Sequence, residues 1–501
     1  RRAIVQYGLA REISSFLLAK TNLKGKAIFS AILKLIKNFF TFLLVESLQK
    51  YPTSKKVIFF FRFSQILVIM NSTKQIALGE HIGTGASCSV YRHHEGDQID
   101  AIKVYNYCSY LVFREFYAAL FLKGPGLAVF KEFGIGSRAW CSQKLYNKLD
   151  IQTTKGDFSV RTIRRIHKLL EALAIVHRNG FVHRDITPAN IFCDPETGDF
   201  VLGDFGSSVK LGFGALAPRT DLVTTLDTRA PEITQDGKYD QSIDIWSMGA
   251  SIYGILTGIS IGIMVYGDYK SIISQGGAIP LFPRFQKDSF KLDGLIDFPP
   301  LLAGLISNML KIDPAERLTI EECLRHPVFQ GLESTIPPQQ KRDIYPDRIQ
   351  DLDTWKKATK IITHNGLSTR ASLTALTLLA DSKNFDIHTT AKCIAGARYI
   401  FEVELCNTVD LPDGNWIYIA PEEVFEFVKT HSACLIVDYQ DTIDCYCRER
   451  SIDDSEQLAN NLIKCLANNP NFLHPYSITQ RVDLIYSLMQ KNPKYLQTSI
   501  Q

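Results

Sequence analysis

VHRDITPANIF occupies residues 182–192, and the tripeptide DFG follows at residues 204–206. Two acids and one amide stand at fixed positions in these motifs, namely Asp185, Asn190 and Asp204. Amide and carboxylate oxygens are ligands that Mg²⁺ prefers, so we expect Asn190 and Asp204 to bind a magnesium ion. Asp185 has the chemistry of a base, or of an orienting acceptor, for a substrate hydroxyl group. The stretch therefore offers one carboxylate suited to proton transfer and two oxygen ligands suited to Mg²⁺.

A glycine-rich stretch, IGTGASCSVY at residues 82–91, opens a region of short, alternating strand-like segments. Gly83 and Gly85 would let the backbone approach phosphate groups closely, and Val90 would cover an adenine ring. Cys88 has two interpretations, a reactive thiol beside the nucleotide or an inert small side chain. The stretch alone is not specific, because glycine-rich hairpins are common.

DAIKVY at residues 100–105 supplies a cation behind the glycine-rich stretch. The ammonium of Lys103 would neutralise the α- and β-phosphates of a nucleotide, while Ala101 would pack against the adenine. Such a lysine needs a carboxylate to hold it. Glu115, on a segment with helical periodicity, is the expected partner. The alternative is that Glu115 faces solvent.

These motifs, joined by APE at 230–232 and SIDIWSMG at 242–249, resemble the eukaryotic-type protein kinase family over residues 76–330. The resemblance implies an α+β, two-lobed protein kinase fold with a small β-rich lobe and a large helical lobe. It further implies a serine/threonine-protein kinase that transfers the γ-phosphoryl group of ATP, with Mg²⁺, to Ser/Thr acceptors of protein substrates. Within the large lobe we expect a buried ion pair between Glu232 and Arg317.

The segment PRTDLVTTLDTRAPEI, residues 218–233, is similar to the activation segment of the cyclin-dependent kinase branch. On that alignment Thr220 matches the activating phosphothreonine, so an activating kinase is an expected partner, and Thr225 supports the substrate pocket. Phosphorylated Thr220 would pair with Arg184 and order the segment. The alternative is an unmodified surface threonine.

Thr187 departs from the family pattern, because Ser/Thr kinases carry a lysine at this position. That lysine contacts the γ-phosphate, and losing one such cation costs about 10²-fold in rate. We therefore expect Thr187 to slow catalysis without abolishing it, and we include it with Asp185, Lys103 and Glu115 among the catalytic positions. The alternative is an ATP-binding pseudokinase that acts as a scaffold. It is motivated by Thr187 and by Cys88, which replaces the third glycine of the family pattern.

The C-terminal third is predicted to be a linker over residues 331–350 and an all-α domain over residues 351–501. In that domain LSTRASLTALTLLADSKNFDIHTTAKCIAGARYIFEVEL, residues 367–405, resembles a cyclin box. On this interpretation a cyclin-like regulatory domain presses the Glu115 helix inward, in cis. A generic helical interaction domain is the alternative, and an inhibitory effect is as consistent with the pattern as an activating one.

Charge is distributed unevenly along the 501 residues, because residues 1–69 carry a net charge of +10 and the other residues a net charge of −6. The slightly acidic body argues against nucleic-acid binding. Eleven cysteines without a CxxC pair predict free thiols, and hence a cytoplasmic or nuclear protein.

The basic, apolar leader at residues 1–69 contains two apolar runs, which are interrupted by Lys34, Lys37 and Arg62. Neither run reaches the roughly 20 uncharged residues of a membrane span, so a membrane partner is not expected. The leader is either a targeting segment or not native coding sequence, since the first Met is Met70. A membrane-attached interaction protein would rest on this leader alone. The kinase domain is accordingly predicted over residues 70–330.

Overall fold

The computed structural model describes residues 78–85, 87–95, 98–106, 109–135, 138–211, 225–233, 239–266, 295, 297–333, 336, 349–401, 407–436, 438–470 and 478–491. The predicted leader, Thr220 and most of the predicted linker lie outside these ranges. Residues 73–501 belong to one compact unit. The predicted boundaries between leader, kinase domain, linker and C-terminal domain stay predictions.

A sheet of five strands forms the first part of the described chain, in the order β1-β2-β3-β5-β4 with antiparallel neighbours. Alternating apolar and polar residues favour strands that bury one face. The helix α4 follows β3 and packs against β4 and β5. These elements are β1 (His81–Thr84), β2 (Cys88–Glu95), β3 (Gln98–Tyr105), α4 (Ser109–Phe121), β4 (Phe130–Ile135) and β5 (Ala139–Lys144).

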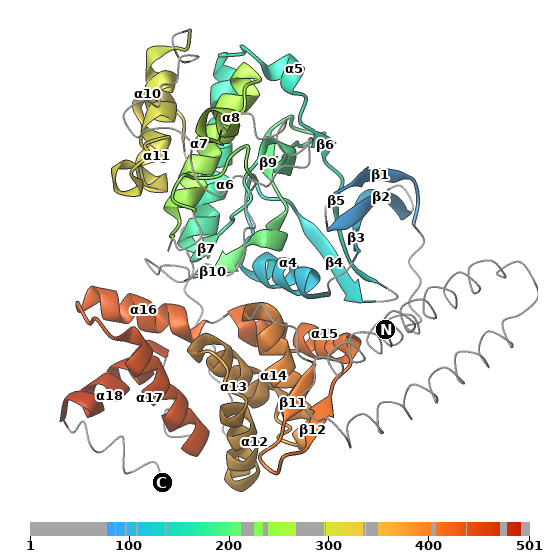
Figure 1. The fold of residues 1–501 in the computed structure, drawn as a ribbon, viewed down its shortest axis with the longest axis vertical. Coiled ribbons are helices and arrows are strands. Elements are labelled where there is room, and N and C mark those ends of the chain that lie inside the picture. Colours follow the sequence, from blue (N-terminus) through green and yellow to red (C-terminus); the bar gives the residue numbers. More distant parts are fainter. Residues whose placement is uncertain are drawn as a thin grey trace, which may run out of the picture. The chain divides into compact units, whose positions relative to one another are not determined.

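The next part, up to Phe329, is mostly helical (Figure 1). Its long helix α6 begins after Ser159, whose side chain accepts a hydrogen bond from Thr162 N, and buries one apolar face. The helices are α5 (Ile151–Thr154), α6 (Val160–Arg178), α7 (Ser242–Thr257), α8 (Ile261–Tyr266), α10 (Pro300–Met309) and α11 (Ile320–Leu324). Short elements between them are β6 (Asn147–Lys148), β7 (Phe181–Val182), η1 (Pro188–Asn190), β8 (Ile191–Cys193), β9 (Phe200–Leu202), η2 (Phe205–Ser207), β10 (Val209–Lys210), η5 (Pro314–Glu316) and η6 (Pro327–Phe329).

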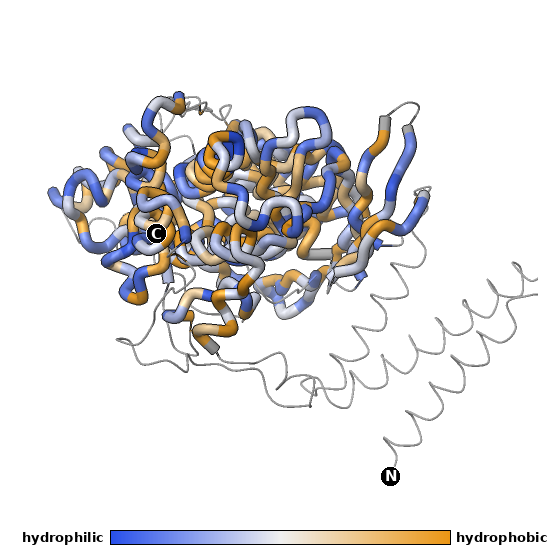
Figure 2. The backbone as a smooth tube through the Cα atoms, turned by 90° about the horizontal axis from the view of Figure 1, so that it is seen from above, coloured by the Kyte–Doolittle hydropathy of each residue, from blue (hydrophilic) through white to orange (hydrophobic). Residues whose placement is uncertain are grey.

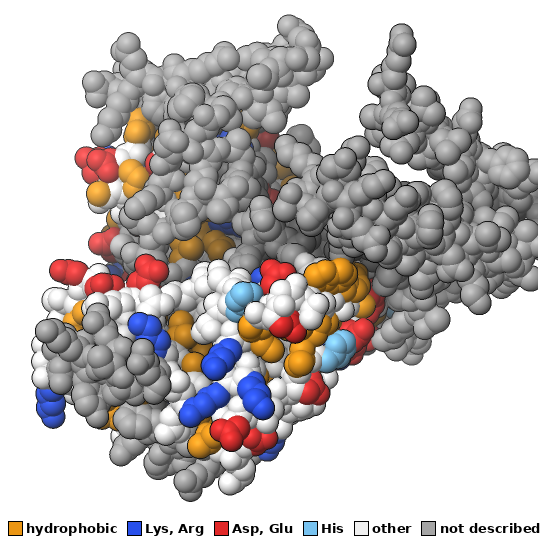
Figure 3. Space-filling model, turned by 60° about the horizontal axis from the view of Figure 1, so that its bottom comes forward, with side chains coloured by type: hydrophobic (Ala, Val, Ile, Leu, Met, Phe, Trp, Pro, Cys, Tyr) orange, Lys and Arg blue, Asp and Glu red, His pale blue; other side chains and the backbone are white. Residues whose placement is uncertain are grey.

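The described residues from 349 to 491, which we call the C-terminal body, consist largely of helices. Their bounds are α12 (Leu352–His364), α13 (Thr369–Ser382), α14 (Ile387–Phe401), α15 (Pro421–Thr430), η7 (Ser432–Ile436), α16 (Tyr439–Glu449), α17 (Ser455–Asn468) and α18 (Ile478–Lys491). Figure 3 shows one face of this body, where basic, acidic and apolar side chains are interspersed.

The prediction of an all-α C-terminal domain agrees with these helices but missed a hairpin of β11 (Thr408–Asp410) and β12 (Trp416–Tyr418). Each strand has only three residues, which is too short for an alternating pattern to emerge. Gly414 has a φ of +85° in the connecting turn, a conformation that glycine adopts without steric strain.

Apolar side chains of the sheet, the large helical part and the C-terminal body join in one continuous buried cluster. Hydrophobic and hydrophilic residues alternate along the helices in Figure 2, as expected of helices that bury one face. In the described part of the chain, no helix is both long enough and apolar enough to cross a membrane.

Candidate functional site

Three charged groups meet where α4, β3 and η2 come together. Lys103 Nζ lies 2.5 Å from Glu115 Oε1 and 2.7 Å from Asp204 Oδ1. Glu115 is completely buried, so the alternative of a solvent-facing side chain is wrong. The Cys141 thiol of β5 also donates to Glu115 Oε2, at 3.2 Å. Nothing in the sequence pattern singled out Cys141, because it comes from a strand distant in the chain.

The electrostatics of this group favour a charged lysine. Burial alone would lower the pKa of Lys103, but Asp204 and Glu115 outweigh burial and raise that pKa well above its usual value. Burial also opposes ionisation of Asp204, yet the neighbouring Lys103 lowers the pKa of Asp204 to about 2. Glu115 differs, because burial raises its pKa in spite of Lys103. The ammonium therefore stays positive over the physiological pH range.

The face of the sheet that carries Lys103 also carries the residues predicted to contact a nucleotide. Ala101 shares this face because side chains alternate along β3, and Val90 pairs directly with Lys103 across β2 and β3. A Cβ on Gly83 would meet no atom within 4 Å, so packing inside the protein does not require glycine there. Gly85 N donates to Cys88 O at 2.8 Å and closes the turn.

Cys88 itself is buried, and burial raises the pKa of its thiol. A raised pKa reduces the thiolate fraction on which nucleophilicity depends. This environment favours the interpretation of Cys88 as an inert small side chain.

Asp185 is held from two sides. Asn190 Nδ2 donates to the Asp185 carbonyl oxygen at 2.8 Å and to Oδ2 at 3.0 Å. Thr225 Oγ1 donates to Asp185 Oδ1 at 2.6 Å. The carboxylate is thereby fixed next to the segment that the sequence assigns to a substrate pocket.

The backbone around Asp185 is anchored by Asp244 at the start of α7. Asp244 Oδ2 accepts from His183 N at 2.7 Å, and Oδ1 accepts from Arg184 N at 3.0 Å. Arg184 has a φ of +68° and Asp204 a φ of +62°, a region that residues other than glycine rarely adopt. Such strain is retained where the surrounding contacts enforce it, and it often occurs at active sites.

Asn190 and Asp204 are suited to a magnesium ion by their chemistry. The amide and the carboxylate both offer oxygen ligands, and Gly203 N donates to Asn190 O at 3.0 Å, which ties the two segments together. Asn190 directs its Nδ2 at Asp185, which leaves its Oδ1 for another partner. Mg²⁺ commonly takes one or two protein ligands beside waters and phosphates, so this pair fits such an ion.

Thr187 is a buried residue that immediately precedes η1. Its side chain does not cap η1. The hydroxyl of Thr228 donates to the carbonyl of the neighbouring Ile186 at 2.7 Å and holds the loop backbone.

The predicted ion pair in the large helical part is present. Arg317 Nη1 and Nη2 lie 2.5 Å and 2.7 Å from the two Glu232 carboxylate oxygens.

Aromatic contacts between α4 and the C-terminal body were not predicted residue by residue. The ring of Phe113 stacks on Tyr399 of α14 with centroids 4.5 Å apart, and it meets Phe425 of α15 edge-on at 5.2 Å. Tyr117, two residues after Glu115, contacts Phe401 with centroids 5.3 Å apart. The helix that carries Glu115 is therefore packed directly against the C-terminal body.

Comparison with known proteins finds a family model that matches part of the chain. The family model described as the protein kinase domain matches residues 134–329. Human mitogen-activated protein kinase 12 is 31% identical over 216 residues, covering 39% of this chain and 58% of the relative. Aurora kinase of Schizosaccharomyces pombe is 31% identical over 162 residues, covering 32% of this chain and 41% of the relative. Mouse cyclin-dependent kinase-like 5 is 30% identical over 219 residues, covering 39% of this chain and 23% of the relative.

The chain thus spans between about a fifth and three fifths of the curated relatives described here. The family match begins after the glycine-rich strands, Lys103 and α4, and it ends before the C-terminal body. It includes the segments that carry Asp185, Asn190 and Asp204. Residues 134–329 therefore match the protein kinase domain, and parts of the chain are similar to a MAP kinase, an Aurora kinase and a cyclin-dependent-kinase-like protein.

Proposed function

We propose that this protein is an active serine/threonine kinase that uses ATP and Mg²⁺ and is regulated in cis by its C-terminal body. The observation that carries the proposal is the position of Lys103 Nζ, which contacts both Glu115 and Asp204. Burying a cation between two carboxylates costs desolvation free energy, so such a group is not expected to serve stability alone. It has a direct use where phosphate charge must be neutralised.

In the proposed mechanism each residue has a distinct role. Gly83, Gly85, Val90 and Ala101 hold the nucleotide, and Lys103 orients its phosphates. Asp185 accepts the proton of, or orients, the attacking Ser/Thr hydroxyl, and Thr225 limits the rotation of that carboxylate by its hydrogen bond at 2.6 Å.

Asn190 and Asp204 hold the magnesium ion in this proposal, and when bound the ion neutralises the developing charge on the phosphates. The relatives named as kinases support the reaction class.

Regulation in cis is supported by the contacts between the C-terminal body and α4. Two of its helices, α14 and α15, pack on α4 through Phe113, and α4 carries Glu115. A helix can bring Glu115 to Lys103 only in one orientation, so contacts that fix α4 favour the assembled site. The cyclin-like interpretation of residues 367–405 is part of this proposal, because α14 lies in that range and supplies Tyr399. We propose that the body activates the kinase.

The phosphorylation of Thr220 by an activating kinase is also a proposal, and Thr220 lies outside the described residues. Cytoplasmic or nuclear residence is supported by the cysteines of the described ranges, which are all free thiols.

The test is transfer of radiolabelled phosphate from ATP to matched peptides that differ only in a Ser, Thr or Tyr acceptor. The full-length protein should label Ser and Thr peptides in the presence of Mg²⁺. Asp185→Asn should lower kcat by about 10²- to 10⁴-fold. Asp353→Asn serves as the matched control, because this carboxylate lies in the exposed first turn of α12.

The alternative is an ATP-binding pseudokinase scaffold. It is supported by Thr187, a neutral residue where kinases carry a cation. This alternative predicts nucleotide binding without phosphate transfer, and no difference in product between wild type and Asp185→Asn. Labelling of the peptides that disappears in Asp185→Asn would exclude the scaffold.

A further inference from the structure

A buried charge cluster lies outside the site described above, between β10 and the C-terminal body. Lys210 Nζ lies 2.6 Å from Asp441 Oδ2 and 3.5 Å from Asp438 Oδ2, both of α16 or its N-cap. Arg370 of α13 donates to the Lys210 carbonyl oxygen and, at 2.6 Å, to Asp441 Oδ1. We call Lys210, Arg370, Asp438 and Asp441 the β10 cluster. Two cations and two anions balance one another in it.

The members of the β10 cluster are largely buried. Only 2% of the Lys210 side chain is exposed, and its ammonium lies 3.6 Å from the centroid of the Phe121 ring. Asp438 Oδ1 caps α16 by accepting from Gln440 N at 3.0 Å. Burial would raise the pKa of Asp438, but Arg370 and Lys210 outweigh burial and lower that pKa. The charges therefore depend on one another.

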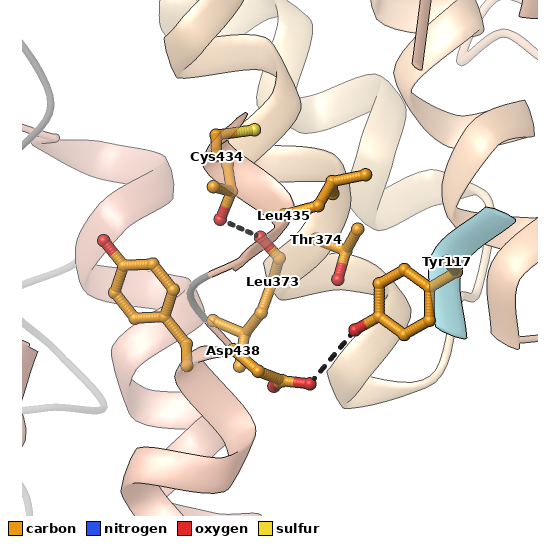
Figure 4. Close-up of a pocket in the computed structure, with 8 residues that line it drawn as sticks. Tyr117, Leu373, Thr374, Cys434, Leu435 and Asp438 are labelled. Atoms are coloured by element: carbon orange, nitrogen blue, oxygen red, sulfur yellow. Dashed lines mark hydrogen bonds between the residues drawn. The ribbon is translucent and has the colours of Figure 1, made fainter. Parts of the chain in front are cut away.

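The β10 cluster is also connected to α4. Tyr117 OH donates to Asp438 Oδ2 at 3.3 Å, as the close-up in Figure 4 shows. A narrow pocket beside this bond is lined by Tyr117, Thr374 and Leu435, among others. One carboxylate, Asp438, thus contacts both the helix of Glu115 and the strand of Lys210.

The strand β10 leads directly to the metal-binding segment. Lys210 stands six positions after Asp204, and β10 pairs with β7 through Lys210↔Phe181 and Val209↔Val182. β7 in turn precedes the loop of Asp185. Arg184 Nε donates to Ser207 O at 2.6 Å and adds a second link between the two segments. A displacement of β10 would therefore reach Asp204 through a short and ordered stretch of chain.

We propose that Lys210 is a positioning residue through which the C-terminal body holds Asp204 in place, by a route separate from the aromatic packing on α4. This inference rests on the proposed function, since it deepens the account of regulation in cis. The aromatic contacts set the position of Glu115, whereas the β10 cluster sets the position of the proposed magnesium ligand. The body thus acts on two parts of the site at once.

The experiment measures binding of a fluorescent ATP analogue to the full-length protein with and without Mg²⁺. In Lys210→Met the gain in affinity that Mg²⁺ provides should fall by roughly 5- to 150-fold, the range of typical coupling between sites. Binding without Mg²⁺ should change little. Lys168→Met is the matched control, because it also removes a lysine that is paired with an aspartate, Asp199 at 2.6 Å, in the large helical part.

The double variant Lys210→Met/Asp441→Asn separates positioning from simple destabilisation. It removes one cation and one anion, so the β10 cluster stays neutral and stability should recover relative to Lys210→Met. The gain from Mg²⁺ should stay low, because the ion pairs between the Lys210 side chain and the aspartates of α16 and its N-cap are still absent. If that gain recovers together with stability, or if Lys210→Met never lowers it, the proposal is overturned.

Failure of the proposed function gives a different result. Wild-type protein that binds nucleotide and Mg²⁺ but transfers no phosphate would refute the kinase, while the binding data would still decide the role of Lys210. Wild-type protein without any Mg²⁺-dependent binding would overturn both proposals.

Discussion

Truncating Phe113 to alanine should disconnect α4 from the C-terminal body. The side chain is fully buried, and such Phe→Ala changes cost about 3–5 kcal/mol of folding free energy. Its two aromatic pairs, with Tyr399 at 4.5 Å and Phe425 at 5.2 Å, each contribute about 0.5–1.5 kcal/mol. About 1–3 kcal/mol of the loss therefore belongs to the contact with the body. A shift of that size changes the population of the assembled site by roughly 5- to 150-fold.

The assay compares kcat for a Ser/Thr peptide, per folded molecule, with the free energy of unfolding from chemical denaturation. Phe329→Ala is the control, because Phe329 is also buried but contacts His167 in the large helical part, with centroids 4.9 Å apart. Both variants should lose similar stability, and only Phe113→Ala should lose activity. Equal activities of the two variants per folded molecule would refute the argument that the body acts through α4.

Three further predictions concern single residues. Thr187→Lys should raise kcat by up to about 10²-fold by adding a cation near the γ-phosphate, and an unchanged or lower rate in steady-state kinetics would contradict the role assigned to this position. Folding lowers the pKa of Asp204 from 3.8 to about 2, so the ionised carboxylate stabilises the folded state above pH 3.8. That stabilisation is lost as the pH falls towards 2. Thermal unfolding of Asp204→Asn should therefore show a smaller loss of stability over this range than the wild type does. Arg317→Ala leaves the Glu232 carboxylate without its bidentate partner and should cost about 3–5 kcal/mol in urea denaturation, whereas a loss under 1 kcal/mol would mean that the pair is effectively solvated.

Short-range patterns in the sequence predicted several local features of the fold. The strand of Lys103 and the helix of Glu115 follow from periodicity, and the loop of Asp185 follows from a motif that resembles the kinase catalytic loop. The roles of these residues in catalysis stay predictions. The hairpin of β11 and β12 was missed, because strands of three residues are too short to show an alternating pattern.

The long-range contacts could not be predicted in the same way. Lys210 and Asp441 are separated by more than two hundred residues, and each alone looks like an ordinary surface charge. Phe113 and Tyr399 likewise belong to apolar faces that any helical bundle would have. Only the packing of α4 and β10 against the C-terminal body reveals these pairings, because it depends on the relative placement of whole elements.

The aromatic contact between α4 and the C-terminal body joins two parts of one polypeptide. A tethered partner is present at an effective concentration set by the chain, commonly in the millimolar range for short connections, and dilution does not change it. A kinase with such an arrangement would not respond to the abundance of a separate cyclin-like chain. Acute control would act on the attachment itself or through the proposed phosphorylation of Thr220.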